Sequence, residues 1–216
     1  MIPLSDRTRM IAPSMTFAID AKAKVLAAQG VDVCNFGVGE PDFVTPAHIR
    51  EAAKAALDAG YTKYTQTAGL PRLRALVAAK LNRENNLPYT PDQVMISTGG
   101  KQALYNILLA ILGPGDEMLI PVPYWVSYSE MVKLAGATPI FLPTSEATEF
   151  KITPEQLEAA ITPRTRALLL NSPSNPTGTV YTPEEITALA QVIVAHGIAV
   201  VADEIYEKLI YDGLRH

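Results

Sequence analysis

The chain has 216 residues, a formal net charge of −4 at pH 7 and a hydrophobic fraction of 48%, which is enough apolar material for one large domain. Its 18 Lys and Arg residues are scattered, so the composition argues against a nucleic-acid-binding surface. The N-terminus has no apolar run long enough for a signal peptide, and no segment approaches the roughly 20 apolar residues of a membrane span, so we expect a cytoplasmic protein.

The first 45 residues differ in pattern from the rest. We expect them to form an N-terminal arm and part of a small domain, with an amphipathic helix over residues 16–29. Further helices are predicted over residues 46–60 and 71–82. Gly60 is typical of a helix end, and Pro71 of a first helical turn.

From residue 94 onward, strand and helix patterns alternate. Strands are predicted at residues 94–97, 117–120, 138–142, 166–171 and 198–202. Helices are predicted at residues 101–112, 124–134, 153–161 and 182–196. This alternation indicates a mostly parallel sheet with helices on both faces, and we expect residues 46–216 to be the first part of such an α/β domain.

Two glycines, Gly99 and Gly100, separate a predicted strand from a predicted helix. They would let backbone N–H groups at the helix N-terminus face an anion, although a tight strand-to-helix turn explains them equally well. Their spacing matches neither the dinucleotide fingerprint nor the Walker loop, which disfavours a plain nucleotide-binding domain.

Polar and aromatic side chains follow three further strands. Asp203 comes directly after the apolar run at 198–202, where a carboxylate needs a cationic partner such as a protonated ring nitrogen; a helix N-cap is the alternative. Tyr206 would face the same site if the chain turned helical there. Asn175 lies in a Pro- and Gly-rich turn that could direct its amide into a crevice or simply stabilise the turn. Trp125 offers a flat π-face or packs in the core.

Six motifs together are specific to one family. They are GEPDF (39–43), KYTQTAG (63–69), GGKQAL (99–104), PYWVSY (123–128), NSPSNPTG (171–178) and ADEIYE (202–207). The set resembles the class I, fold-type I aminotransferases that use pyridoxal 5′-phosphate, and most of all the bacterial aspartate aminotransferases. The resemblance covers essentially the whole chain. It implies a truncated large domain with a mostly parallel α/β/α sheet, plus the N-terminal segment of the small domain.

The resemblance also implies cofactor-binding roles. The residues concerned are Tyr64, Gly99, Gly100, Lys101, Trp125, Asn175, Asp203 and Tyr206. Asp203 would keep the pyridine nitrogen protonated, so that the ring becomes an electron sink. Asn175 and Tyr206 would bond its phenolic oxygen, and Trp125 would stack on its face. The phosphate would be held by the backbone of residues 99–101 and by Tyr64 of the neighbouring subunit in a homodimer.

Substrate contacts are implied for Gly39, Lys101, Trp125 and Asn175. Many relatives have a small residue where Lys101 stands, and we hypothesise that its ammonium contacts the distal carboxylate of an acidic substrate. The expected reaction is transamination between an amino acid, aspartate, and a 2-oxo acid, 2-oxoglutarate. A lyase or synthase of the same fold, or a non-catalytic fragment that binds the cofactor or a partner, is the alternative.

The resemblance places the Schiff-base lysine beyond His216, so no catalytic residue is assigned in this chain. Lys208 stands at a variable family position and is rejected for that role. We therefore expect the 216 residues alone to be inactive and aggregation-prone, with exposed sheet edges. No metal site is predicted, because the histidines lie outside the motifs, and Cys34 is expected to be a small buried side chain.

Overall fold

The computed structural model describes residues 2–13, 15–37, 39 and 43–216. The chain divides into two compact units, one formed by Met1–Ser14 with Gly99–His216 and the other by Met15–Thr98. This division does not test the domain boundary expected near residue 45, which stays a prediction.

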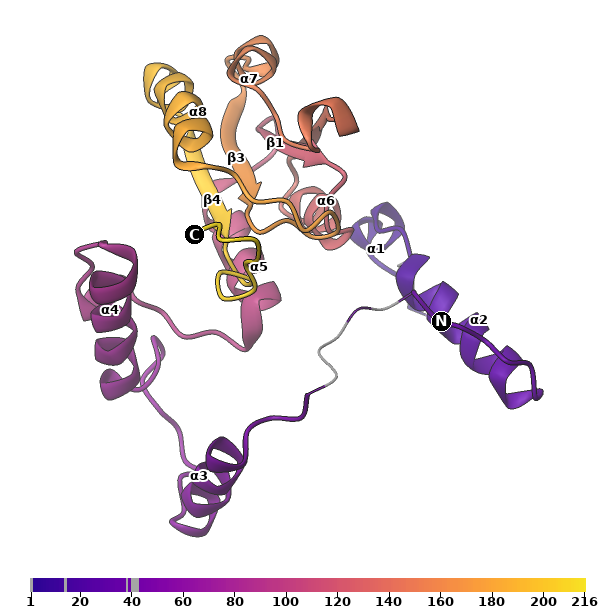
Figure 1. Cartoon of the computed structure of the whole chain (residues 1–216), viewed down its shortest axis with the longest axis vertical. Helices are drawn as coiled ribbons and strands as arrows, with labels where there is room; N and C mark the ends of the chain where they lie inside the picture. Colours follow the sequence, from indigo (N-terminus) through magenta and orange to yellow (C-terminus); the bar gives the residue numbers. More distant parts are fainter. Residues whose placement is uncertain (1, 14, 38, 40–42) are drawn as a thin grey trace. The chain divides into compact units, whose positions relative to one another are not determined.

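A parallel sheet forms the centre of the first unit (Figure 1). Its strands are β1 (Glu117–Val122), β2 (Thr138–Pro143), β3 (Thr165–Asn171) and β4 (Ala199–Asp203), in the order β2-β1-β3-β4. Every pairing is parallel, and the register of β3 and β4 brings Asn171 opposite Asp203. The predicted α/β class with a parallel sheet is confirmed.

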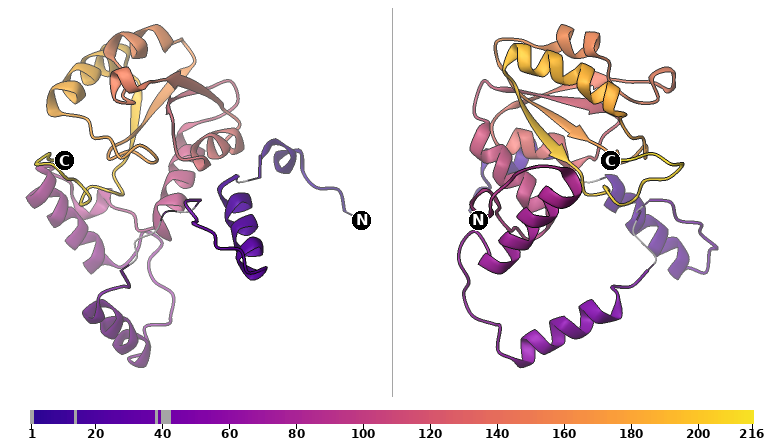
Figure 2. Two further views of the ribbon diagram at one scale, coloured as in Figure 1. Left: turned by 45° about the vertical axis from the view of Figure 1, so that its right-hand side comes forward. Right: turned by 60° about the vertical axis from the view of Figure 1, so that its left-hand side comes forward.

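Helices cover both faces of this sheet (Figure 2). Side chains alternate between the faces along each strand, so apolar side chains on both faces need a covering layer. On one face, Met118 and Ile120 of β1 pack against α5 (Gly99–Ile111) and α6 (Ser127–Leu134). On the other face, Leu119 lies with α7 (Pro154–Ala160) and α8 (Pro183–His196). The helix expected over residues 124–134 is α6, which begins three residues later than predicted.

The starts of α7 and α8 follow from a repeated sequence pattern. Thr153 and Thr182 each precede Pro and accept a hydrogen bond from the backbone N–H three residues later, and the residue at that position bonds back. This capping box satisfies two backbone donors that the helix itself cannot. Two short elements complete the unit, the helix α1 (Asp6–Met10) and the 3-10 turn η2 (Glu146–Thr148).

The second unit contains α2 (Met15–Ala28), α3 (Ala47–Asp58), α4 (Pro71–Asn85) and the 3-10 turn η1 (Pro91–Gln93). Its α4 packs on η1, and the Arg74 Nε donates to the carbonyl oxygen of Val94 at 2.8 Å. Gly69 has a φ of +102°, and a Cβ there would lie 2.6 Å from Cγ1 of Ile96, so this position requires glycine.

The strand predicted at residues 94–97 is wrong. Val94 has an extended backbone, but the Ile96 N–H donates to the carbonyl oxygen of Ala68, and no described strand pairs with residues 94–97. A strand needs a neighbouring strand for its backbone groups, which an apolar pattern alone does not supply.

The expectation for Cys34 is also wrong, because this side chain is exposed. Neither hydrophobic cluster found among the described residues includes any part of Met15–Thr98. The segment around Cys34 therefore has no core in which to bury the thiol. No helix of the described residues is both long and apolar enough to cross a membrane.

Candidate functional site

The carboxyl ends of β1, β3 and β4 meet at one edge of the sheet, because parallel strands all point the same way. Ligands of open α/β sheets bind in the crevice outside this edge. Three predicted site residues reach it from different strands: Trp125 after β1, Asn175 after β3 and Asp203 at the end of β4.

The Asp203 carboxylate is half-buried and has two protein donors. The Tyr128 hydroxyl donates to Oδ2 at 2.6 Å, and the Ile205 N–H donates to Oδ1 at 3.2 Å. No Lys, Arg or His among the described residues forms an ion pair with it. Because no helix follows β4, the N-cap alternative does not apply. The carboxylate can therefore still accept a hydrogen bond from a cationic ligand.

Trp125 links Asp203 to the start of α5 through a series of contacts. Its ring meets the Tyr128 ring edge-on, with centroids 5.3 Å apart and planes at 86°. Near the start of α5, the Lys101 Nζ lies over the Trp125 indole, 4.9 Å from the ring centroid. Such a cation–π contact holds an exposed ammonium near an aromatic face. The structure thus brings Lys101, Trp125 and Asp203 into one contact series.

Asn171 fastens the turn after β3 to the end of β4. Its Nδ2 donates to the carbonyl oxygen of Asp203 at 2.9 Å, and its Oδ1 accepts from the Asn175 N–H at 2.7 Å. The side-chain amide of Asn175 is half-buried and bonds to none of the described residues. It is therefore free to bond a ligand at the crevice.

Tyr206 lies in a turn rather than in the helix that would place it beside Asp203 by i,i+3 spacing. Tyr206 is the smallest of the contributors that raise the pKa of Tyr128. Burial is the main cause of that rise, followed by the hydrogen bond to Asp203. Tyr128 consequently remains a neutral hydrogen-bond donor at physiological pH.

Gly99 and Gly100 form the exposed first turn of α5. Gly99 has a φ of +80°, a conformation that favours glycine, and a Cβ at either position would meet no atom within 4 Å. The N-terminus of this helix is open, as a phosphate-binding turn requires.

Two predicted site residues belong to the other unit. Tyr64 and Gly39 are both exposed. The remaining GEPDF positions 40–42 lie outside the described residues. The roles of Tyr64 and Gly39 stay predictions.

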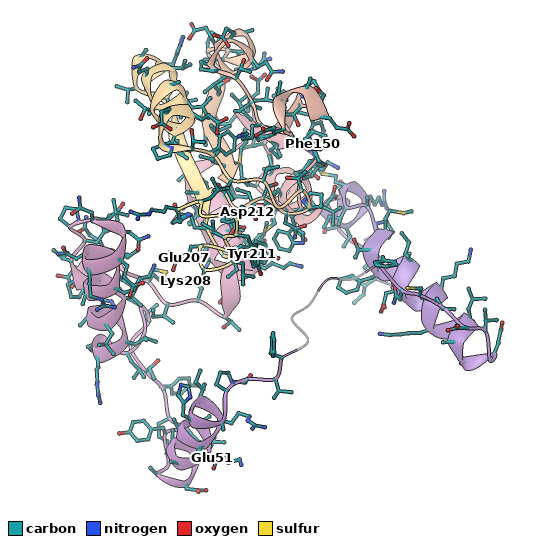
Figure 3. All side chains as sticks on the ribbon, in the orientation of Figure 1. Glu51, Phe150, Glu207, Lys208, Tyr211 and Asp212 are labelled. Atoms are coloured by element: carbon teal, nitrogen blue, oxygen red, sulfur yellow. The ribbon has the colours of Figure 1, made fainter. Side chains whose placement is uncertain are left out.

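Lys208 lies next to Glu207 in the turn-rich segment after β4 (Figure 3). It is exposed, and its rejection as the Schiff-base residue stays a prediction. His196 ends α8 and pairs with Glu158 at 2.8 Å. The ligand atoms of Glu204, Glu207 and His216 lie within 4.8 Å of one another, but exposed acidic groups commonly gather without a metal.

Sequence reasoning gave no role to Tyr128 or Asn171. Both stand in motifs that were recognised, PYWVSY and NSPSNPTG, and Tyr128 is three residues after Trp125, a spacing that places two side chains on one side of a helical turn. The hydrogen bonds to Asp203 cross 75 and 32 residues of sequence, which no local pattern reveals.

The site residues of the first unit suit pyridoxal 5′-phosphate. Asp203 has no cationic partner among the residues described, the amide of Asn175 is unbonded, and Trp125 presents an aromatic ring. The open turn at Gly99 suits a phosphate. In the same order, these groups match the protonated ring nitrogen, the phenolic oxygen, the planar ring and the phosphate dianion of the cofactor.

Comparison with known proteins gives a consistent result. The model of the family "Aminotransferase class I and II" matches residues 31–216. An aspartate aminotransferase of Geobacillus stearothermophilus is 53% identical over 213 residues, which are 99% of this chain and 54% of that protein. An aspartate/prephenate aminotransferase of Cereibacter sphaeroides is 54% identical over 210 residues, 97% of this chain and 52% of the relative.

Solved structures agree with the sequence comparison. The aspartate aminotransferase from Thermus thermophilus with maleate superposes with a TM-score of 0.95 at 50% identity, covering all of this chain and 56% of that one. The aspartate aminotransferase from Rhizobium meliloti gives a TM-score of 0.96 at 41% identity, covering 54% of its chain. The chain therefore spans about half the length of the relatives it matches.

Proposed function

Because this chain belongs to the class I and II aminotransferases, we propose that it is the N-terminal part of an enzyme that transfers the amino group of aspartate to a 2-oxo acid such as 2-oxoglutarate. The cofactor of aspartate aminotransferases of this class is pyridoxal 5′-phosphate, as the sequence predicted. When bound, it supplies an electron-withdrawing ring. The homodimer and the cytoplasmic location expected from the sequence belong to this proposal.

One observation carries the proposal: the Asp203 carboxylate stands at the carboxyl end of β4 with no ion pair to a described residue. A carboxylate in such a crevice stabilises a cation, and a protonated pyridine nitrogen is the cation that fits the neighbouring aromatic and amide groups. Asp203 would hold that proton on the nitrogen.

The neighbouring residues would orient the ring. Asn175 would donate its free amide to the phenolic oxygen, and Tyr206 would donate its hydroxyl to the same atom from the turn after β4. Trp125 would lie against the ring face. Together these contacts would leave one face of the ring for the amino acid.

The phosphate would bind at the start of α5. Gly99 and Gly100 add no side chain at the start of this helix and leave open space around it, and the helix dipole favours an anion there. Lys101 would add a backbone N–H. Tyr64 would reach the phosphate of the partner subunit, and Gly39 would contact the substrate through its backbone.

Substrate selection would depend on Lys101. The contact with Trp125 keeps its exposed ammonium beside the site, where it can bind the distal carboxylate of aspartate. Asn175 would help to hold the α-carboxylate. An acidic substrate is thus favoured over an apolar one of similar size.

The cofactor proposal can be tested in this chain without a Schiff-base lysine. Pyridoxamine 5′-phosphate forms no Schiff base with lysines, and Trp125, the single tryptophan, reports its binding by fluorescence quenching. Asp203→Asn should weaken binding about tenfold or more, because the amide oxygen still accepts a hydrogen bond but lacks the negative charge that stabilises a protonated ring nitrogen. Asp212→Asn, an exposed change in the same segment, is the matched control. Equal affinities for the two variants would refute the role of Asp203.

The role of Lys101 has a separate test. Stable conjugates of reduced cofactor with L-aspartate and with L-alanine should compete at this site, and Lys101→Ala should weaken the aspartate conjugate about tenfold while changing the alanine conjugate little. Lys22→Ala, in an exposed part of α2, serves as the control. Equal losses for both conjugates would contradict recognition of the distal carboxylate.

A further inference from the structure

Tyr128 combines full burial with a polar contact to the proposed cofactor site. The residue lies on α6 at 1% exposure, within the cluster that joins α5, α6 and the sheet. Its hydroxyl nevertheless reaches the end of β4, with 2.6 Å between the phenolic oxygen and Oδ2 of Asp203. Packing alone would be satisfied by phenylalanine, so the hydroxyl needs a separate explanation.

The hydroxyl is a permanent donor in this setting. Burial first, and then the neighbouring carboxylate, raise the pKa of Tyr128 above its ordinary value, so the phenol stays protonated. With Tyr128 on Oδ2 and the Ile205 N–H on Oδ1, each carboxylate oxygen of Asp203 has one fixed donor. Two donors on different oxygens fix the plane of the carboxylate and leave the remaining lone pairs for a ligand.

The same ring touches the second residue of the site. Trp125 meets Tyr128 edge-on at 5.3 Å, a favourable aromatic geometry that sets the tilt of the indole. A single buried side chain therefore contacts both the group that would face the ring nitrogen and the group that would face the ring plane. Tyr128 connects α6 with β4 across 75 residues of sequence.

We propose that Tyr128 is a positioning residue, whose phenol aligns the Asp203 carboxylate with the Trp125 indole so that the nitrogen and the face of one pyridine ring are met together. This inference rests on the proposed function. Tyr128 itself does not touch the cofactor: it acts through Asp203, and its hydroxyl matters only for a ring that carries a protonated nitrogen.

Ligand chemistry separates positioning from a merely structural role. Pyridoxamine 5′-phosphate and an analogue with carbon in place of the ring nitrogen are titrated against the full 216-residue chain, with Trp125 fluorescence as the signal. Tyr128→Phe should weaken pyridoxamine 5′-phosphate about tenfold and change the analogue by less than about twofold, since the analogue has no nitrogen for Asp203 to bond. In an Asp203→Asn background the tenfold effect should vanish.

Tyr181→Phe is the matched control. Tyr181 is also a buried phenol with one hydrogen bond, which it accepts from the backbone N–H of Ile152, and it does not contact Asp203. Removal of the Tyr181 hydroxyl should leave the dissociation constants of pyridoxamine 5′-phosphate and of the analogue unchanged. Equal losses for the two ligands in Tyr128→Phe would overturn the positioning role.

A second measurement does not depend on any ligand. Urea unfolding of the unaltered chain, Tyr128→Phe, Asp203→Asn and the double variant forms a double-mutant cycle, and the pair should be coupled by about a factor of ten in the unfolding equilibrium constant. Strictly additive changes in the free energy of unfolding would overturn the inference, because they would show that Tyr128 and Asp203 are not coupled. Failure of the unaltered chain to bind pyridoxamine 5′-phosphate would overturn the cofactor site proposed for this chain and the role of Tyr128 together, whereas binding that Tyr128→Phe leaves unchanged would overturn the role of Tyr128 alone.

Discussion

The anchoring of α5 to the sheet gives a sharp prediction, because two adjacent leucines on this helix differ in burial. Leu108 has 0% exposure and packs in the cluster with Met118 and Ile120, whereas Leu109 is 44% exposed. Leu108 and Leu104 are four residues apart on one side of the helix, so they fix the orientation of the turn that begins at Gly99.

Leu108→Ala should destabilise the first unit by about 2–5 kcal/mol. Removal of the buried carbons forfeits roughly 2–3 kcal/mol of transfer free energy, and the cavity left in the packed cluster accounts for the rest. Leu109→Ala removes the same atoms from a half-exposed position and leaves no cavity, so about 1 kcal/mol or less is expected.

Urea titration with Trp125 fluorescence measures both changes, since the only tryptophan lies in the same unit and packs on the same cluster. The midpoint for Leu108→Ala should fall well below that for Leu109→Ala while the slope stays the same. Equal midpoints would refute the inference that α5 is held to the sheet through Leu108.

Two further predictions concern α8. Thr182→Ala removes the oxygen that accepts the Glu185 N–H at 3.2 Å and should cost about 1 kcal/mol, whereas Thr187→Ala within the helix should cost less; urea midpoints compare them, and equal losses would argue against the cap. Burial raises the pKa of Glu185. Hydrogen bonds from the Lys151 ammonium and the Thr182 N–H lower this pKa by a larger amount, so the net shift is downward. A lowered folded-state pKa gives stability that is complete above the unfolded pKa and is lost as the pH falls below about 4. Lys151→Met should therefore flatten the acid side of the stability profile, and an unchanged profile would count against this ion pair.

Local chemistry in the sequence determined much of the fold. The helices predicted at residues 153–161 and 182–196 begin within one residue of α7 and α8, since the capping box that starts each of them needs only neighbouring residues. Apolar runs between helices predicted the strands of the parallel sheet, because such strands are buried on both faces. The family and its cofactor followed from motifs that bring together residue types suited to a phosphate and a protonated ring.

Contacts between distant segments decided the rest. Residues 94–97 have a strand-like pattern but no strand partner among the described residues, and Cys34 is apolar enough for a core that the described part of its unit does not form. Tyr128 is an ordinary core aromatic by sequence. Its hydroxyl acquires a role only because parallel pairing carries Asp203 to the same edge of the sheet, where a hydrogen bond depends on three-dimensional distance rather than on spacing along the chain.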